Sequence, residues 1–412
     1  MYKQLHIGLF GFGCVGQGLY DIINKTAFEA EIVKICVKDK QKSRSLPAHH
    51  FTFDKDEILQ NPQINLIVEL IDDADEAYRI VSTALKNGKN VVTANKKMLA
   101  EHLSELIDLQ RKYSTSLLYE AACCGSIPII RNLAEYYDNE WLNAVSGIFN
   151  GSSNYILTKV FQENQPYAEA LAQAQQLGFA ETNPILDVGA FDPKYKLCII
   201  TAQAYGIVVS PEAVFNYGIQ TFATADLQFA REKGFKVKLI AQAYKINEEE
   251  ITLFVMPQLI PKEHYLYHVE NEYNGVIVEA AFSDKQVFLG KGAGGHPTGS
   301  AVLSDISACR YEYRYEYKKA TSGRHIRYST NQWIEIYLRY THEADLQLFD
   351  FETISVKYQG TDTNYLIGVV SLTNLLEKRD ILAQKDIFLA NTGRKIASQP
   401  ATVPQAQETV WA

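Results

Sequence analysis

The segment from Glu181 to Lys196 holds the residues with the clearest chemical potential. Asp192 precedes Pro193, a pair typical of a helix start in which the carboxylate is the N-cap and proline takes the first helical position. Lys196 would then lie one turn into the helix, on the same face as Asp192. A lysine there opposes the helix dipole at a cost of a few tenths to about 1 kcal/mol, so a purely structural helix gains nothing from it. The pair therefore fits proton transfer and, equally, a capped helix with surface charges.

A second lysine, Lys96, ends the motif Thr93-Ala94-Asn95-Lys96. The motif follows a predicted strand, Asn90 to Thr93, and so lies at the edge of the sheet where open α/β folds bind ligands. Position alone allows two interpretations of Lys96: a contact to cofactor or substrate, or an ordinary exposed lysine.

A glycine turn near the N-terminus has the spacing G-x-G-x-x-G between a short apolar strand and a helical pattern. The first glycine permits the turn, the second lets backbone approach a pyrophosphate, and the third lets the helix pack on the strand. The helix N-terminus adds amides and a positive dipole. We therefore expect a dinucleotide at Gly11, Phe12, Gly13, Cys14, Val15 and Gly16; the alternative is a glycine turn that only packs.

The end of the second predicted strand reads Val37-Lys38-Asp39-Lys40. An acidic residue there bonds the ribose of NAD, whereas a basic one accommodates the 2′-phosphate of NADP. Lys38 favours NADP and Asp39 could serve NAD, so the choice stays open.

A second glycine-rich stretch, Gly290 to Gly295, either brings backbone close to a ligand or forms a tight turn; we assign its Gly292 and Gly294 to the cofactor.

The elements that position these residues alternate strand and helix, the order of a doubly wound parallel α/β sheet. Predicted strands are Leu5 to Phe10, Glu31 to Val37, Leu66 to Ile71, Asn90 to Thr93 and Leu117 to Tyr119, with a helix from Glu76 to Lys86. Alternating tyrosines from Tyr311 to Tyr317 predict a half-exposed strand.

The change in pattern along the chain predicts several domains. We expect a dinucleotide-binding Rossmann domain over 1–130, with 300–330 packing back on it, and an α+β catalytic and dimerisation domain over 131–305. A separate small α+β module over 331–392 has the order strand, short helix, two strands, helix, strand. Residues 393–412 are expected to form a loose tail.

The composition excludes several classes of protein. With 412 residues, 47% hydrophobic, 21% charged and a formal charge of -8, the chain is typical of globular proteins that act on small molecules, not of nucleic-acid or membrane binders. Six cysteines show no metal-binding spacing and are expected to be reduced thiols. The N-terminus resembles no signal peptide, so we expect a cytoplasmic protein.

Taken together, these motifs resemble homoserine dehydrogenase over about residues 1 to 310. The motifs are Gly11 to Gly16, Thr93 to Lys96, Gly151-Ser152-Ser153-Asn154-Tyr155, Glu181 to Lys196 and Gly292 to Thr298. The resemblance implies NAD(P)-dependent interconversion of L-homoserine and L-aspartate 4-semialdehyde, in the route to threonine, methionine and isoleucine. It also implies a homodimer or homotetramer.

The resemblance also implies roles for individual residues. Lys196 matches the proton donor to the aldehyde oxygen, Asp192 its partner, and Lys96 the lysine beside nicotinamide and substrate. The substrate-binding positions are Glu181, Asp187, Gly151 and Ser152. The loop from Glu120 to Ile127 is similar to one that binds a sodium ion through the backbone carbonyls of Glu120, Cys123, Gly125 and Ile127.

Three features depart from the family pattern. Asn183 stands where the family usually has Asp, which favours another amino-acid semialdehyde as substrate. Asp72 and Asp73 would repel a phosphate-bearing cofactor unless they turn away, which favours a catalytically silent sensor. The C-terminal module resembles an ACT regulatory domain, but the run from Thr341 to Leu346 lacks the usual glycine, so no threonine feedback is expected.

Overall fold

The N-terminal part of the chain forms a six-stranded parallel sheet in the order β3-β2-β1-β4-β5-β6. This is the strand order of a Rossmann fold and confirms the predicted α/β class. β1 pairs with β2 on one side and β4 on the other, so short apolar strands are buried at the centre of the sheet. The strands are β1 (Leu5–Phe10), β2 (Ala30–Cys36), β3 (Phe51–Thr52), β4 (Leu66–Glu69), β5 (Asn90–Thr93) and β6 (Leu117–Leu118).

Helices follow these strands, and side-chain caps define where two of them begin. Asp73 accepts a hydrogen bond from Glu76 N at the start of α3, and Asn95 accepts one from Met98 N at the start of α4. The helices are α1 (Cys14–Thr26), α2 (Asp56–Leu59), α3 (Ala74–Lys86) and α4 (Lys96–Tyr113), with a 3-10 turn η1 (Ala48–His50). Lys96 is thus the first residue of a helix that leaves the carboxyl edge of the sheet.

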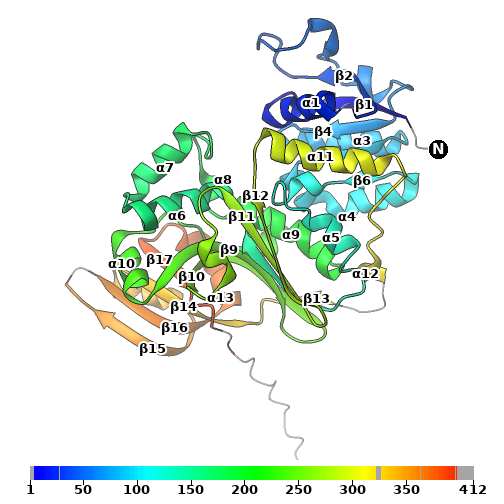
Figure 1. Cartoon of the computed structure of the whole chain (residues 1–412). Coiled ribbons are helices and arrows are strands. Elements are labelled where there is room, and N and C mark those ends of the chain that lie inside the picture. The colour runs from blue at the N-terminus through cyan, green and yellow to red at the C-terminus, as the bar shows by residue number, and fades with distance from the viewer. Residues whose placement is uncertain (1–3, 27, 322–325, 362, 395, 397–412) are drawn as a thin grey trace, which may run out of the picture.

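The computed structural model describes residues 4–26, 28–321, 326–361, 363–394 and 396. Figure 1 shows the N-terminal sheet and its helices on the right and a second, larger sheet on the left and below. Most of the predicted loose tail, 395 and 397–412, lies outside the described residues.

The middle of the chain builds most of an 11-stranded sheet. A linking segment carries η2 (Glu120–Ala122) and α5 (Ile129–Ala134). The strands are β7 (Leu142–Ile148), β8 (Phe215–Asn216), β9 (Phe235–Lys245), β10 (Glu250–Pro261), β11 (Tyr273–Ala280), β12 (Asp284–Lys291) and β13 (Arg327–Tyr328). The helices are α6 (Gly151–Glu163), α7 (Tyr167–Gln176), α8 (Ile185–Val188), α9 (Phe191–Tyr205) and α10 (Thr224–Glu232), with 3-10 turns η3 (Pro211–Ala213) and η4 (Tyr265–His268).

After the middle strands the chain returns to the N-terminal part. Helix α11 (Gly295–Cys309) packs so closely on α1 that a Cβ at Gly18 would lie 2.3 Å from Gly295 O. The predicted boundary at 305 therefore falls within a helix that lies against the Rossmann part, shown in yellow in Figure 1.

The predicted strand from Tyr311 to Tyr317 is wrong. This stretch is irregular, and its carbonyls accept side-chain hydrogen bonds from the Rossmann part, Tyr313 O from Ser116 and Tyr315 O from Gln110. The tyrosines become more buried along the stretch, from the exposed Tyr311 to the buried Tyr315 and Tyr317, while the charged residues between them are exposed. No strand of the described residues pairs with this stretch. A short helix, α12 (Lys318–Thr321), follows.

The C-terminal segment has the predicted order of elements, and one of its strands pairs with the large sheet. Its strands lie in the order β17-β14-β16-β15, and β17 pairs with β10 and so continues the large sheet. The buried Arg339 guanidinium reinforces this union through Asp226 of α10, 3.0 Å away. The elements are β14 (Trp333–Tyr340), the 3-10 helix η5 (Glu343–Leu348), β15 (Phe351–Gln359), β16 (Asn364–Ser371), α13 (Leu372–Leu382) and β17 (Ile387–Asn391). Among the helices of the described residues, none is long and apolar enough to cross a membrane.

Candidate active site

The helix that carries Asp192 and Lys196 begins two residues before the predicted Pro193 start. Ala190 adopts a left-handed conformation with φ of 65°, and α9 starts at Phe191 without a side-chain cap. The predicted N-cap role of Asp192 is therefore wrong. Asp192 is the second helical residue, which leaves its carboxylate free for other partners. Proline in third place costs nothing, because a first-turn N–H has no partner within the helix.

The Asp192 carboxylate joins two lysines from different parts of the molecule. Its Oδ2 lies 2.7 Å from Lys196 Nζ, one turn further along α9, as the spacing predicts. Its Oδ1 lies 2.7 Å from Lys96 Nζ, which reaches over from the start of α4. Asp192 is 3% exposed, whereas the Lys96 side chain is 41% exposed. The pair of helices thus places a buried carboxylate and two ammonium groups where the two parts meet.

Opposing forces set the charge of this cluster. Burial opposes ionisation of Asp192, but the Lys196 and Lys96 charges and hydrogen bonds outweigh it and hold the pKa of that carboxyl well below its usual range. The Asp192 charge raises the pKa of Lys96, against the effect of burial. Asp192 is therefore ionised at neutral pH and keeps Lys96 charged. The Lys196 ammonium also donates to Phe149 O at 2.7 Å.

Sequence reasoning missed one member of this cluster, Asn150. It is buried at the N-cap of α6, and its amide nitrogen donates to Asp187 Oδ1 at 2.6 Å and to Asp192 Oδ2 at 2.9 Å. Burial raises the pKa of Asp187, and the neighbouring Asp192 charge raises it further. In the sequence, Asn150 shows only as the polar residue before Gly151, a pattern that predicts a turn.

The other predicted substrate residues have different environments. Glu181 is exposed, and its carbonyl accepts a hydrogen bond from Gln175 Nε2 at 3.0 Å. Gly151 begins α6 and lies so close to Glu272 O that a Cβ would approach it to 2.6 Å. The Ser152 hydroxyl donates to Phe179 O. Asn183 is also exposed, and its side chain accepts from Ile185 N at 3.4 Å.

Packing requires two of the three glycines in the glycine turn, Gly11 and Gly16. Gly11 has φ of 93°, and a Cβ there would lie 2.5 Å from Leu70 O. At Gly16 a Cβ would lie 2.5 Å from Gly11 O, so the helix can pack on the turn only without a side chain. No described atom lies within 4 Å of the place where a Cβ at Gly13 would stand. The open space at Gly13 fits the backbone approach of a pyrophosphate. Cys14 and Val15 begin α1 beyond it.

The acidic side chain of the loop after β2 is bonded to that loop's own backbone. Asp39 Oδ1 accepts hydrogen bonds from Gln41 N at 2.8 Å and Lys42 N at 3.2 Å, and both Lys38 and Asp39 are exposed. Asp73 is likewise engaged as the cap of α3. Asp73 accepts a hydrogen bond from its own helix, which weakens the repulsion expected between this carboxylate and a phosphate. Asp72 stays exposed.

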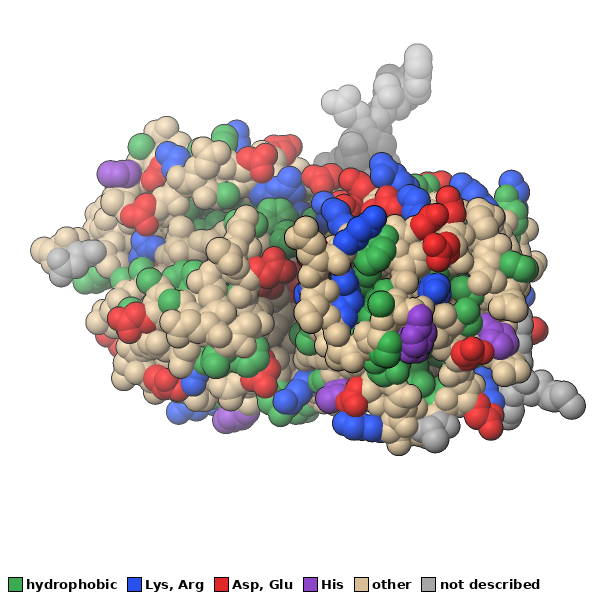
Figure 2. Space-filling model, turned by 90° about the horizontal axis from the view of Figure 1, so that it is seen from above, with side chains coloured by type: hydrophobic (Ala, Val, Ile, Leu, Met, Phe, Trp, Pro, Cys, Tyr) green, Lys and Arg blue, Asp and Glu red, His purple; other side chains and the backbone are tan. Residues whose placement is uncertain are grey.

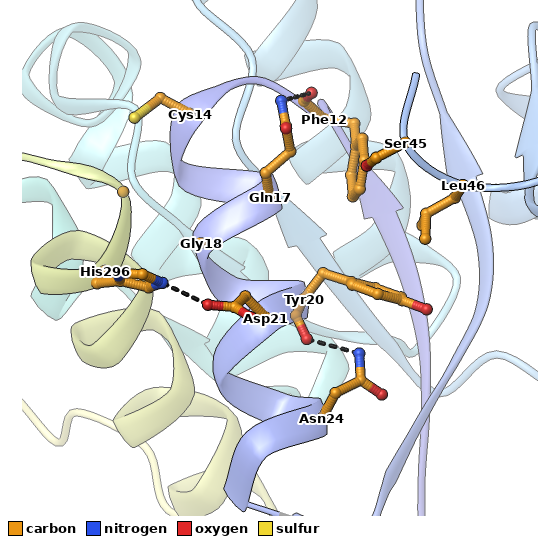
Figure 3. A pocket seen from close by; sticks show the side chains of 11 residues that line it. Phe12, Cys14, Gln17, Gly18, Tyr20, Asp21, Asn24, Ser45, Leu46 and His296 are labelled. Carbon is orange, nitrogen blue, oxygen red and sulfur yellow. Dashed lines mark hydrogen bonds and ion pairs between the residues drawn. The ribbon is translucent and has the colours of Figure 1, made fainter.

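A cavity of about 710 Å³ opens on the flank of the glycine turn. Figure 3 shows Phe12 and Cys14 of the turn at one end, Asp21 and Asn24 further along α1, and His296 opposite. His296 Nε2 lies 2.6 Å from Asp21 Oδ2 and so ties α11 to α1. This cavity is lined by residues of the glycine turn, α1, the loop after β2 and the start of α11, and none of them belongs to the Asp192 cluster. Viewed from above, a hollow separates the two parts, with acidic and basic side chains along it (Figure 2).

The predicted cation loop packs against the second glycine-rich stretch. Cys124 and Gly125 both have positive φ, 56° and 57°, and Ser126 N donates to Lys291 O at 3.0 Å. A Cβ at Gly292 would lie 2.1 Å from the Asn274 side chain, and Gly294 precedes α11 with φ of 125°. Of the predicted carbonyls, that of Glu120 accepts from Cys123 N and that of Ile127 from Ile129 N.

Comparisons with known proteins agree with this geometry. Residues 11–120 match the family model described as the homoserine dehydrogenase NAD binding domain, and residues 128–307 match that of homoserine dehydrogenase. The homoserine dehydrogenase of Lactococcus lactis is 37% identical over 73% of each chain, and that of Bacillus subtilis is 34% identical over 74% of this chain and 73% of its own.

Solved structures give the same result. A homoserine dehydrogenase from Thiobacillus denitrificans covers 95% of this chain and 98% of its own, with a TM-score of 0.80 and 26% identity. A hyperthermophilic archaeal homoserine dehydrogenase in complex with NADPH covers 76% of this chain and 99% of its own, with a TM-score of 0.66 and 25% identity. The chain therefore belongs to the homoserine dehydrogenase family and catalyses the NAD(P)-dependent interconversion of L-homoserine and L-aspartate 4-semialdehyde.

Proposed function

We propose that Lys196 is the proton donor of this reaction and that Asp192 holds it in place. The supporting observation is the Asp192 carboxylate, buried and 2.7 Å from both the Lys196 and the Lys96 ammonium. When bound, the nicotinamide supplies or accepts the hydride at the substrate carbonyl carbon. Lys196 gives its proton to the aldehyde oxygen as an alcohol forms, and takes it back from the alcohol in the oxidative direction. Asp192 stays ionised throughout and does not carry the proton.

The remaining ionisable groups suit an amino-acid substrate. We assign the substrate's ammonium group to the carboxylates of Glu181 and Asp187, because opposite charges attract most strongly where water is partly excluded. Lys96 is exposed enough to face both substrate and cofactor. Gly151 and Ser152 would border the substrate at the start of α6, next to the Asp187 and Asp192 carboxylates that Asn150 joins.

A comparison of two substrates tests whether the enzyme acts on homoserine or on another amino-acid alcohol. The test follows reduced-cofactor absorbance while the purified protein meets L-homoserine, or its homologue one carbon longer, with NAD or NADP. We expect turnover with L-homoserine. Turnover of the longer homologue alone would show that Asn183 has changed the substrate, and no turnover with either compound would refute the proposed roles.

We infer that NADP is preferred over NAD. Lys38 and Asp39 are both exposed, but the Asp39 carboxylate is bonded to its own loop amides, and Lys38 lies just after β2, where a 2′-phosphate would lie. A Lys38→Ala variant should raise the KM for NADP about tenfold, the effect of one lost charge-assisted contact, and leave the KM for NAD unchanged. Equal KM values for the two cofactors in the wild type would contradict this preference.

We also propose a sodium ion at the loop from Glu120 to Ile127. The left-handed pair Cys124 and Gly125 winds this loop tightly. A carbonyl oxygen has two lone pairs, so those of Glu120 and Ile127 can still bind a cation besides their amide partners. Carbonyls suit a hard ion. Thermal unfolding in sodium and in tetramethylammonium chloride at equal ionic strength tests this, because only a bound ion raises the midpoint with sodium concentration.

The domain limits, oligomeric state and location stay predictions. We propose an ACT-like module over 331–392 because its strand order, with the fourth and first strands adjacent and the second at the edge, suits that fold. Without a glycine between Thr341 and Leu346 we expect no heat of threonine binding in calorimetry. Light scattering should give a homodimer or homotetramer, and fractionation a cytoplasmic protein.

A further inference from the structure

The side chain of Asn150 makes three hydrogen bonds in a buried position. It is 4% exposed and stands between the end of β7 and the start of α6. Its Oδ1 accepts from Ser153 N at 2.8 Å. Its Nδ2 donates to Asp187 Oδ1 at 2.6 Å and to Asp192 Oδ2 at 2.9 Å. Both protons of the amide group are thus used on carboxylates that belong to two other helices, α8 and α9.

These partners fix the orientation of the amide. Ser153 N–H can only donate, so it requires the carbonyl oxygen of Asn150. Ionised carboxylates can only accept, so they require the NH2 group. A flipped amide would set its oxygen against two carboxylates and its NH2 against an N–H, and would lose all three bonds. The helix cap therefore orients the donor that faces the acidic pair.

We propose that Asn150 is a positioning residue for the proton-transfer pair Asp192 and Lys196. Asn150 acts through Asp187 and Asp192 and does not touch the reacting atoms. The two carboxylates repel each other, and a shared donor keeps both turned inward. The Asp192 oxygen that Asn150 bonds, Oδ2, is also the one 2.7 Å from Lys196 Nζ. Asn150 thereby orients the Asp192 carboxylate, which in turn orients Lys196. The proposal rests on the proposed roles of Lys196 and Asp192.

The charges around the pair indicate what loss of Asn150 would change. The groups that face Asp192 are Lys196 on its own helix, Lys96 from α4, Asp187 from α8 and the thiols of Cys123 and Cys124 from the η2 loop. The Asn150 hydrogen bond lowers the pKa of both Asp187 and Asp192, against the burial that raises it. Without this donor both carboxylates should take up protons at higher pH.

Two substitutions separate this role from helix capping. Serine and aspartate are both good N-caps, so Asn150→Ser and Asn150→Asp keep the bond to Ser153 N. Asn150→Ser removes the two donors, and Asn150→Asp puts an acidic oxygen in place of the NH2. We expect kcat to fall about 10- to 100-fold in Asn150→Ser, the range for a lost bond to a charged group, and further in Asn150→Asp.

The acidic limb of the pH profile is the readout that a structural role would not move. We expect it to shift upward by about one pH unit in Asn150→Ser, because the acidic pair loses its donor. The KM for NADP should stay within twofold, since Asn150 lies away from the glycine turn. Ser371→Ala removes the N-cap of α13, which follows β16 at a different place in the same sheet, and serves as the matched control, with kcat unchanged.

The outcomes distinguish this proposal from the roles on which it rests. A wild-type kcat and an unshifted acidic limb in Asn150→Ser, beside an inactive Lys196→Ala, would overturn the role of Asn150 alone. Full activity in Lys196→Ala would refute the proposed roles themselves. If Asn150→Asp does not fold, circular dichroism will show it, and Asn150→Ser, which carries no added charge, decides the question.

Discussion

Replacement of Asp192 by asparagine tests the electrostatic centre of the site. The substitution keeps the shape of the side chain but removes the carboxylate charge that lies 2.7 Å from both the Lys96 and the Lys196 ammonium. At an effective dielectric constant of about 20, two unit charges 2.7 Å apart attract by roughly 6 kcal/mol, and the loss of hydration on burial cancels much of this. Removing one partner of a buried pair costs about 3–5 kcal/mol, because the other charge is left unpaired.

The structure places Asp192→Asn at the lower end of that range. The Lys96 side chain is 41% exposed, so water screens its charge, and Asp187 remains near Lys196 as a second anion. We therefore expect the free energy of unfolding at pH 7 to fall by about 3 kcal/mol. We expect kcat to fall by a factor of about 10² to 10⁴, the range for proton transfer, because Lys196 loses its orientation.

The difference in unfolding free energy between wild type and Asp192→Asn should depend on pH with a definite sign. The pKa of Asp192 is lower in the folded than in the unfolded chain, so its contribution is complete above the unfolded value of about 3.9 and is lost as pH falls toward the folded value. The difference between wild type and Asp192→Asn in urea unfolding should shrink by about 1 kcal/mol from pH 7 to pH 3. Equal stability at pH 7, or a difference that grows in acid, would refute this reasoning.

Three further predictions concern other parts of the molecule. Gly11→Ala should destabilise the fold by about 1–3 kcal/mol because of its positive φ and the Leu70 contact, as measured by urea unfolding. Gly13→Ala should fold with unchanged stability yet lose cofactor affinity at least about tenfold in a fluorescence titration, since the methyl group projects into open space. Burial raises the pKa of Glu120 to about 8, helped by the Asp305 charge, so the folded state binds more protons than the unfolded state and stability should decline as pH rises from about 4 toward 8. Glu120→Gln should flatten that decline, and an unchanged slope would contradict the assignment.

Short-range patterns sufficed to predict the Rossmann part. The strands β1 and β5 have the predicted bounds, because a brief apolar run ended by glycine or a polar cap is a local signal. The glycine turn was predictable for the same reason. Gly16 answers a packing constraint from the turn itself and Gly11 one from Leu70 after β4, whereas Gly13 leaves open space for a ligand.

The start of α9 could not be predicted from Asp192 and Pro193 alone. A left-handed Ala190 ends the preceding turn, and alanine carries no sequence signal for that conformation. The alternating tyrosines after α11 predicted a strand that is absent there, for a related reason. Gln110 and Ser116, about two hundred positions away, bond the backbone of this stretch, and period-two burial arises there without a ladder.

The acidic cluster was predictable only in part. Asp192 and Lys196 are neighbours along one helix, so their spacing indicated their contact. The meeting of Lys96 with Asp192 depends on how α4 packs against α9, and the bridge from Asn150 depends on three helices at once. Only tertiary structure brings these residues together, although the family resemblance indicated their roles.

The turnover of Lys196→Ala tests the central claim most directly. With saturating L-homoserine and NADP, kcat should fall by a factor of about 10² to 10⁴ relative to wild type, because no other group replaces the proton donor. Cofactor affinity, measured by fluorescence titration on the same sample, should stay unchanged. A variant that binds cofactor normally and keeps kcat within about threefold of wild type would contradict the assignment of Lys196 as proton donor.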